Sequence, residues 1–139
     1  MERDAREAQV KAVDTNVLLR YIVRDDQRQF DTAVMFLGAR TAADPVFVSL
    51  IVAVELIWVL RRQYRYPRED IRTAIMALME AAEVVFEDEE YLSALLASFP
   101  KGDIADHLIA HCATRAGCSS TVTFDKVAAS GIPSMELLS

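Results

Sequence analysis

The chain has few of the features that mark secreted, membrane-spanning or cofactor-binding proteins. Its two cysteines, Cys112 and Cys118, are too few for a disulfide framework. No apolar stretch approaches the roughly 20 residues of a membrane span, and the first residues mix charges of both signs, unlike a secretion signal. Neither a Gly-x-Gly-x-x-Gly nor a Walker A motif occurs, so nucleotide cofactors have no support. We therefore expect a soluble, cytoplasmic protein.

Lysine is nearly absent, and the net charge of −6 argues against binding nucleic acid through a broadly basic surface. Arginine nevertheless clusters, and it suits bidentate contact with phosphate or carboxylate. A solvated helix face stabilised by Glu69 and Asp70 explains the larger cluster equally well. The two clusters consist of Arg61, Arg62, Arg65, Arg68 and Arg72, and of Arg20, Arg24 and Arg28.

At 139 residues and 53% hydrophobic content, the chain predicts one domain over residues 1–139, with a flexible or frayed segment at 1–9. Because helices separate the expected strands, the connections are crossovers and the sheet is mostly parallel. Ligands of such folds gather at the carboxyl edge of the sheet. Strands are predicted at residues 10–13, 46–48, 84–86, 121–124 and 134–138, and helices at 17–23, 26 to about 44, 50–64, 67–82, 89–99 and 103–116.

Acidic residues stand where these elements begin, end or are interrupted. Asp14 and Asp125 directly follow predicted strands, and Asp103 and Asp106 share the first turn of a helix. Glu55 interrupts a long apolar helix, where an unpaired charge would be costly. Carboxylates that converge from distant parts of a chain repel one another, and a hard divalent cation is the simplest group that offsets this repulsion.

Structural roles account for several of these acids as well. Asp14, Asp103 and Asp125 are all good helix caps, and Glu55 could form a salt bridge with an arginine such as Arg20. Asp106 is harder to explain in this way because it lies inside the first turn, so we favour it over Asp103 as a ligand.

The surroundings of Glu55 and Asp125 add detail to this set of acids. The apolar residues around Glu55, among them Ile51 and Trp58, predict that its helix face points inward. Thr123 could hydrogen-bond a water or a neighbouring carboxylate.

Four segments of the chain together resemble the PIN domain and, more narrowly, the VapC toxins of bacterial toxin–antitoxin pairs. Each motif alone is weak, but their order and spacing are specific, and the resemblance runs from about Val10 to Leu138. The segments are Ala12-Val13-Asp14-Thr15-Asn16-Val17-Leu18-Leu19-Arg20-Tyr21, Val52-Ala53-Val54-Glu55-Leu56, Asp103-Ile104-Ala105-Asp106-His107-Leu108-Ile109-Ala110 and Thr121-Val122-Thr123-Phe124-Asp125-Lys126.

The resemblance implies a PIN-like α/β/α sandwich with a mostly parallel central sheet of four to five strands. It also implies a homodimeric endoribonuclease that uses one or two magnesium or manganese ions and is neutralised by a VapB-like antitoxin. The catalytic and metal-binding acids carried over are Asp14, Glu55, Asp106 and Asp125, with Asp103 as a further ligand; Asn16, Thr15 and Thr123 support them, and Arg20, Arg24, Arg61, Arg62 and Arg65 are candidates to contact RNA or the antitoxin.

The sequence departs from the family at His107, which replaces the small residue usual after the third acid. Two alternatives to the ribonuclease stay open. A haloacid-dehalogenase-like phosphatase also carries an aspartate after its first strand, but it needs a second acid where this chain has Asn16. A catalytically silent module that only binds an antitoxin is the other.

Overall fold

The computed structural model describes residues 10–139, and the segment 1–9, expected to be flexible or frayed, lies outside the described residues. The described chain contains seven helices and five strands. It divides into two compact units, one ending at Ser98 and the other running from Phe99 to Ser139. The expectation of a single domain over the whole chain stays a prediction.

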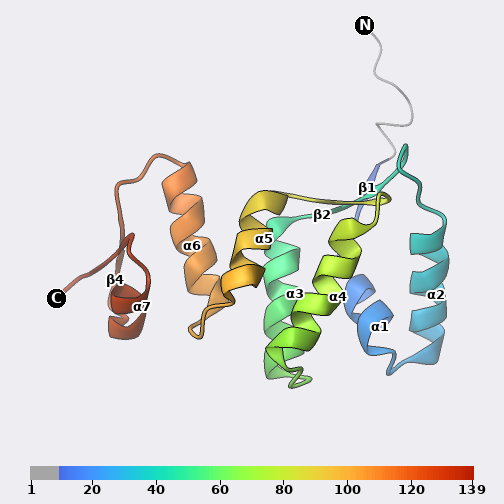
Figure 1. The fold of residues 1–139 in the computed structure, drawn as a ribbon, viewed down its shortest axis with the longest axis horizontal. Helices are drawn as coiled ribbons and strands as arrows, with labels where there is room; N and C mark the ends of the chain where they lie inside the picture. Colours follow the sequence, from blue (N-terminus) through green and yellow to red (C-terminus); the bar gives the residue numbers. More distant parts are fainter. Residues whose placement is uncertain (1–9) are drawn as a thin grey trace, which may run out of the picture. The chain divides into compact units, whose positions relative to one another are not determined.

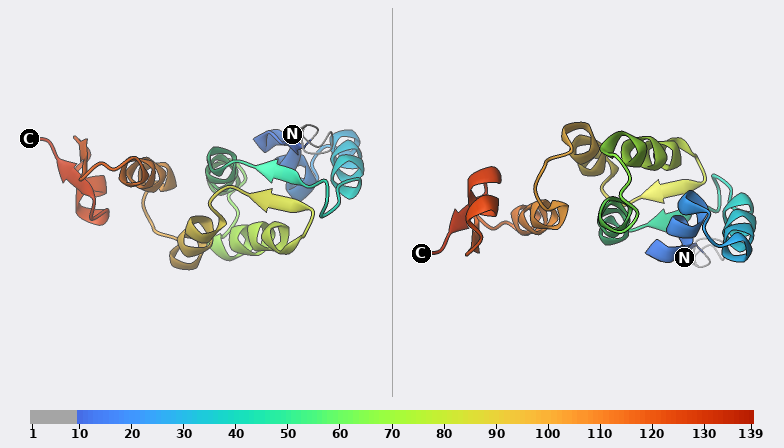
Figure 2. Two further views of the ribbon diagram at one scale, coloured as in Figure 1. Left: turned by 90° about the horizontal axis from the view of Figure 1, so that it is seen from above. Right: turned by 90° about the horizontal axis from the view of Figure 1, so that it is seen from below.

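The first unit contains a three-stranded parallel sheet in the order β1-β2-β3. Ala12 lies opposite Phe47, and Phe47 lies opposite Val85. Figure 1 shows the sheet at one end of helices α1 to α4, and Figure 2 shows β2 and β3 pointing the same way. The elements are β1 (Lys11–Ala12), α1 (Thr15–Val23), α2 (Gln27–Gly38), β2 (Val46–Val48), α3 (Leu50–Arg62), α4 (Arg68–Glu80), β3 (Val84–Phe86) and α5 (Glu89–Ser98).

The core of the first unit is made where the central strand meets the helices. Val46 and Val48 of β2 are fully buried, as expected for the middle strand of a parallel sheet. The helices contribute buried aliphatic residues at helical spacing, and this burial is the main driving force for packing. Those residues are Leu18 and Leu19 of α1, Leu56, Ile57 and Leu60 of α3, Ile71 and Ile75 of α4, and Leu92 and Leu96 of α5.

The second unit is a small helix–strand–helix–strand arrangement. It comprises α6 (Ile104–Arg115), β4 (Thr121–Thr123), α7 (Lys126–Gly131) and β5 (Met135–Leu137). β4 and β5 pair in parallel, with Thr121 opposite Met135, because α7 returns the chain beside β4. Ala110, Ala128, Ile132 and Met135 form its buried apolar cluster.

The predicted α/β class and the parallel strands are confirmed, and every predicted strand and helix is found. The ends differ slightly, except that α2 ends at Gly38 and not near residue 44 as predicted. One correction concerns the sheet. The five described strands form a sheet of three and a sheet of two rather than one sheet of four to five. The reason is that β4 pairs with β5, the next strand along the chain, which follows it through α7. Within residues 10–139, no helix has the length and apolar character needed to cross a membrane.

Candidate active site

Asp14 stands where β1 gives way to α1. The Val13 amide still donates to the Phe47 carbonyl (3.1 Å), so the strand ladder continues up to the residue before Asp14. Asp14 then takes an extended conformation and caps α1, and its Oδ1 accepts a hydrogen bond from the Thr15 amide (2.8 Å). The predicted cap is therefore present, and the carboxylate is exposed at the carboxyl end of β1.

Thr15 connects the start of α1 to α3. Its side chain is buried, and its hydroxyl donates a hydrogen bond to Oε1 of Glu55. A buried hydroxyl needs a partner, and the carboxylate supplies it. The structure thus brings the neighbour of Asp14 into direct contact with Glu55, although the two residues are 40 positions apart.

Glu55 is exposed, so the prediction that its helix face points inward is wrong. Ile51 and Trp58 on the same face of α3 are also exposed, at 70% and 46%. α3 is apolar on nearly every side, and the buried face is instead the one that carries Leu56, Ile57 and Leu60. The considered salt bridge from Glu55 to Arg20 is not formed, because Arg20 pairs with Asp25 (2.9 Å).

Asp103 and Asp125 are helix caps in the second unit. Asp103 Oδ1 accepts from the Ala105 amide (2.9 Å) at the start of α6. Asp125 Oδ1 accepts from the amides of Val127 (2.9 Å) and Ala128 (3.0 Å) at the start of α7. The Thr123 hydroxyl accepts from the Asp125 amide (3.0 Å), so Thr123 fixes the turn that carries this aspartate.

Asp106 is the acid whose ionisation is most affected by its surroundings. Burial raises the pKa of Asp106 above its ordinary value, and the negative charges of Asp103 and Asp125 raise it further. His107 opposes this shift, which gives the unusual histidine a definite electrostatic effect. Three acids of the second unit therefore crowd one another, and a cation near Asp106 would relieve that crowding.

The three capping aspartates each use a single carboxylate oxygen for the cap. In Asp14, Asp103 and Asp125 the hydrogen bonds go to Oδ1. Among residues 10–139, none donates to the Oδ2 atoms of these three side chains. Capping and metal binding are therefore compatible, since the backbone amides orient the carboxylate and leave one hard oxygen donor available.

The carboxylates are divided between the two units, with Asp14 and Glu55 in the first and Asp103, Asp106 and Asp125 in the second. Within the described part of the chain, no three His, Cys, Asp or Glu side chains are arranged as a metal-binding group. The all-oxygen donor set fits magnesium or manganese in its chemistry. Convergence of all these acids on one ion stays a prediction.

A cavity of about 820 Å³ in the first unit opens beside Asp14. Asp14 and Asn16 line it together with Lys11, Arg20 and Arg28. The sequence indicated Arg20 and Arg28 as part of an arginine cluster, but it gave no reason to select Lys11. Its signal is positional, because Lys11 is a basic residue on the strand that leads to Asp14.

A comparison with known protein families identifies the family of this chain. The family model for the PIN domain matches residues 11–130, and the chain therefore belongs to the PIN domain family. PIN domains are typically metal-dependent nucleases, which gives the general class of activity. No curated protein matches the chain.

Proposed function

We propose that the chain is a VapC-like toxin, a magnesium- or manganese-dependent endoribonuclease that hydrolyses RNA phosphodiester bonds in the cytoplasm. The observation that carries the proposal is the match of residues 11–130 to the PIN domain family, and the repulsion of Asp106 by Asp103 and Asp125, which a divalent cation would offset, supports it. Family membership favours a nuclease over the alternative phosphatase.

Asp14, Glu55, Asp106 and Asp125 would hold the ion or ions, with Asp103 as a further ligand. A bound divalent cation supplies an activated water for attack on phosphorus and stabilises the leaving oxygen. The donor set is chemically suited to this task because every member is a carboxylate.

The chain's own residues orient these groups. Backbone amides at the starts of α1 and α7 donate to Asp14 and Asp125 and orient their carboxylates. Thr15 holds Glu55 through its hydroxyl, and Thr123 fixes the turn before α7. Such preorganisation reduces the reorganisation needed when the substrate reacts.

The test is RNA cleavage by purified protein that is free of any partner, with magnesium, manganese or a chelator. Asp14→Asn and Asp106→Asn should each abolish metal-dependent cleavage, because each removes a carboxylate ligand. Glu80→Gln is the matched control, since Glu80 is an exposed acid at the end of α4. Circular dichroism should show all three variants folded, and undiminished cleavage by both asparagine variants would reject the assignment.

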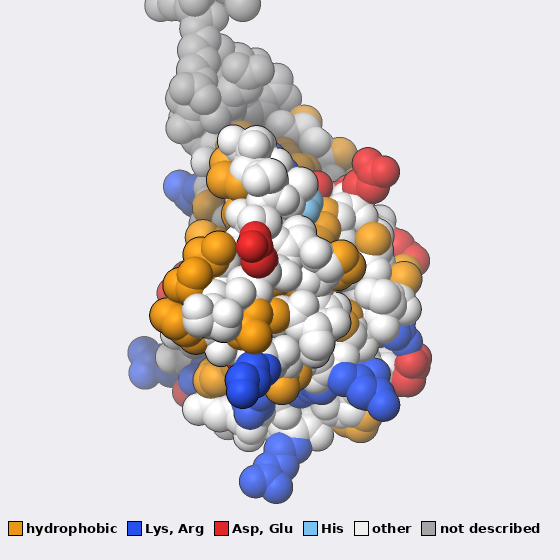
Figure 3. Space-filling model, turned by 90° about the vertical axis from the view of Figure 1, so that its left-hand side faces the viewer, with side chains coloured by type: hydrophobic (Ala, Val, Ile, Leu, Met, Phe, Trp, Pro, Cys, Tyr) orange, Lys and Arg blue, Asp and Glu red, His pale blue; other side chains and the backbone are white. Residues whose placement is uncertain are grey.

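The proposal includes a homodimer and a VapB-like antitoxin that keeps the enzyme inactive. It is supported by exposed apolar side chains, since large apolar patches on a protein surface often mark interfaces. Ile51 and Trp58 are exposed in the first unit, and Val122 and Phe124 are 58% and 78% exposed in the second, whose surface is seen in Figure 3. Light scattering on the purified chain tests the dimer, and a monomer at all concentrations would contradict it.

A further inference from the structure

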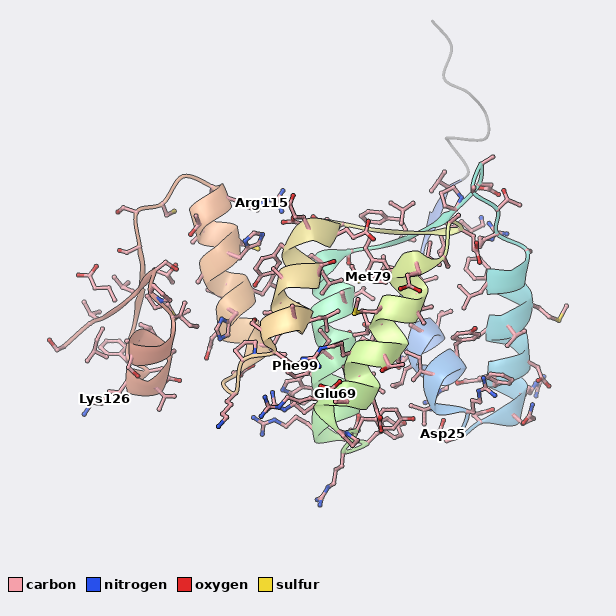
Figure 4. The ribbon with its side chains drawn as sticks, viewed as in Figure 1. Asp25, Glu69, Met79, Phe99, Arg115 and Lys126 are labelled. Carbon is pink, nitrogen blue, oxygen red and sulfur yellow. The ribbon has the colours of Figure 1, made fainter. Side chains whose placement is uncertain are left out.

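The end of α3 and the turn that follows it carry a concentrated positive charge. Residues 61–68 contain four arginines and no acid, in a chain of net charge −6. Figure 4 shows nitrogen-bearing side chains gathered at the ends of α3 and α4, near Glu69. Arg62 and Arg65 are exposed there, and within residues 10–139 neither forms an ion pair.

The acids of α4 do not neutralise these two arginines in the way the sequence allowed. Glu69 pairs with Arg72 instead. Interaction of cations with the helix dipole accounts for a basic residue such as Arg62 in the last turn of α3. It does not account for Arg65, which lies beyond the helix.

The backbone conformation at Arg65 indicates that its side chain has a role other than forming the turn. Arg65 has φ +56°, in the left-handed region that few residues other than glycine and asparagine adopt readily. An arginine at this position contributes nothing to the turn that glycine would not supply with less strain. Its distinctive contribution is the exposed guanidinium.

The turn is also firmly anchored. Asp25, at the end of α1, accepts hydrogen bonds from Arg20 (2.9 Å) and from the Tyr64 hydroxyl (3.1 Å). Tyr64 directly precedes Arg65, so the Asp25 carboxylate ties the turn to the end of α1. Arg62 and Arg65 are therefore presented from a fixed position in the first unit.

We propose that Arg62 and Arg65 bind the phosphate backbone of single-stranded RNA a few nucleotides away from the bond that is cut. The inference rests on the proposed function. Glu55 and Arg62 lie on the same helix, separated by a rise of about 10 Å. Arg62 is therefore too far from Glu55 to contact the same phosphate. The arginines act only on substrates that extend beyond the cleaved bond. They favour longer RNA over fragments that reach only Asp14 and Glu55.

The experiment compares kcat/KM for a short RNA, which covers only the cleaved bond and its neighbours, with that for a longer RNA of the same central sequence. The variants are Arg65→Gly alone and Arg65→Gly combined with Arg62→Gln. Glycine accepts the left-handed conformation, so the first variant removes charge without weakening the turn. Arg65→Lys keeps the charge, and Arg40→Gln is a control for net charge elsewhere in the unit.

For the double variant, kcat/KM on the longer RNA should fall on the order of tenfold at low salt. The slope of log kcat/KM against log salt concentration should become shallower by about 1.4, the value for two lost single-strand phosphate contacts. Cleavage of the short RNA should not change. Arg65→Lys should retain most of the kcat/KM that Arg65→Gly loses on the longer RNA. Equal losses on both substrates, or no loss on either, would overturn the proposal. Unchanged cleavage with weaker inhibition by the antitoxin would also overturn it, and would assign the arginines to protein binding.

Fluorescence anisotropy with single-stranded RNA in chelator separates this inference from the proposed function. If the unaltered protein cleaves neither substrate but binds RNA through Arg62 and Arg65, the ribonuclease assignment fails and the binding site stands. If cleavage is normal and binding is indifferent to both arginines, the binding site is rejected and the ribonuclease stands.

Discussion

Single aspartates in this protein combine a structural role with an available ligand atom. The carboxylates of Asp14, Asp103 and Asp125 each direct Oδ1 to backbone amides. From the sequence, capping and metal binding were competing explanations for these residues. Separate oxygens remove the competition, because helix amides satisfy one atom and orient the other.

Substitutions at Asp125 should separate the two roles. Asparagine is a good helix cap and lacks the negative charge, so Asp125→Asn should leave the free energy of unfolding nearly unchanged while weakening metal-dependent cleavage. Alanine cannot cap, and Asp125→Ala should cost about 1 kcal/mol in addition. Urea denaturation and cleavage assays measure the two effects. Equal stability of the two variants would show that the cap contributes nothing.

Asp25 should make stability depend on pH in the acid range. Burial opposes its ionisation, but hydrogen bonds from Arg20 and Tyr64 outweigh that effect and lower the pKa of Asp25 below its ordinary value. Folding therefore favours the ionised form, and the stabilisation is complete above the unfolded pKa of about 3.9. It is lost as the pH falls through the lower folded value.

The measurement is the melting temperature of the unaltered protein and of Asp25→Asn between neutral pH and the acid limit of folding. The variant should melt lower at pH 7, and the difference should shrink at pH values below the ordinary pKa of aspartate. A constant difference across the whole range would mean that ionisation of Asp25 plays no part.

Helices and strands were largely predictable, because each has a clear local signal. β2 and β3 occupy the predicted residues 46–48 and 84–86, and the caps at Asp14, Asp103 and Asp125 begin helices as expected. The orientation of α3 was not predictable. Its apolar residues surround the axis, so periodicity cannot select the buried face, and Glu55 was placed on the wrong side.

Contacts between elements could not be predicted from the sequence either. The pairing of Asp25 with Arg20 and Tyr64 joins two turns that no sequence pattern relates. The raised pKa of Asp106 depends on Asp125, which lies on another helix start. Partner choice of this kind follows from tertiary packing, and a single sequence carries no record of it.

The hydrogen bond between α1 and α3 should matter for both elements. Thr15→Val keeps the shape of the buried side chain and removes the hydroxyl that contacts Glu55. We expect a loss of about 1 kcal/mol in the free energy of unfolding and a fall in kcat, because Glu55 is no longer held. Thr15→Ser retains the donor and should preserve kcat. A fall in kcat for serine equal to that for valine would assign the effect to packing.

At the scale of the whole molecule, the proposed ligands come from both compact units. If they serve the same ion, manganese should raise the melting temperature of the unaltered protein. At a concentration one hundred times the dissociation constant, the gain would be about 2.7 kcal/mol. Asp14→Asn and Asp106→Asn should each lose this gain, although they alter different units. Thermal unfolding with and without manganese tests this, and retention of the full gain in either variant would exclude that residue as a ligand.

The order in which the acids occur along the chain has a consequence during translation. The ribosome releases the segment with Asp14 and Glu55 well before it makes Asp103, Asp106 and Asp125. Because compact units can form as they emerge, the first unit can fold while Asp103, Asp106 and Asp125 are still inside the ribosome. If cleavage needs carboxylates of both units, as proposed, a growing polypeptide stays inactive towards RNA until the second unit has also emerged.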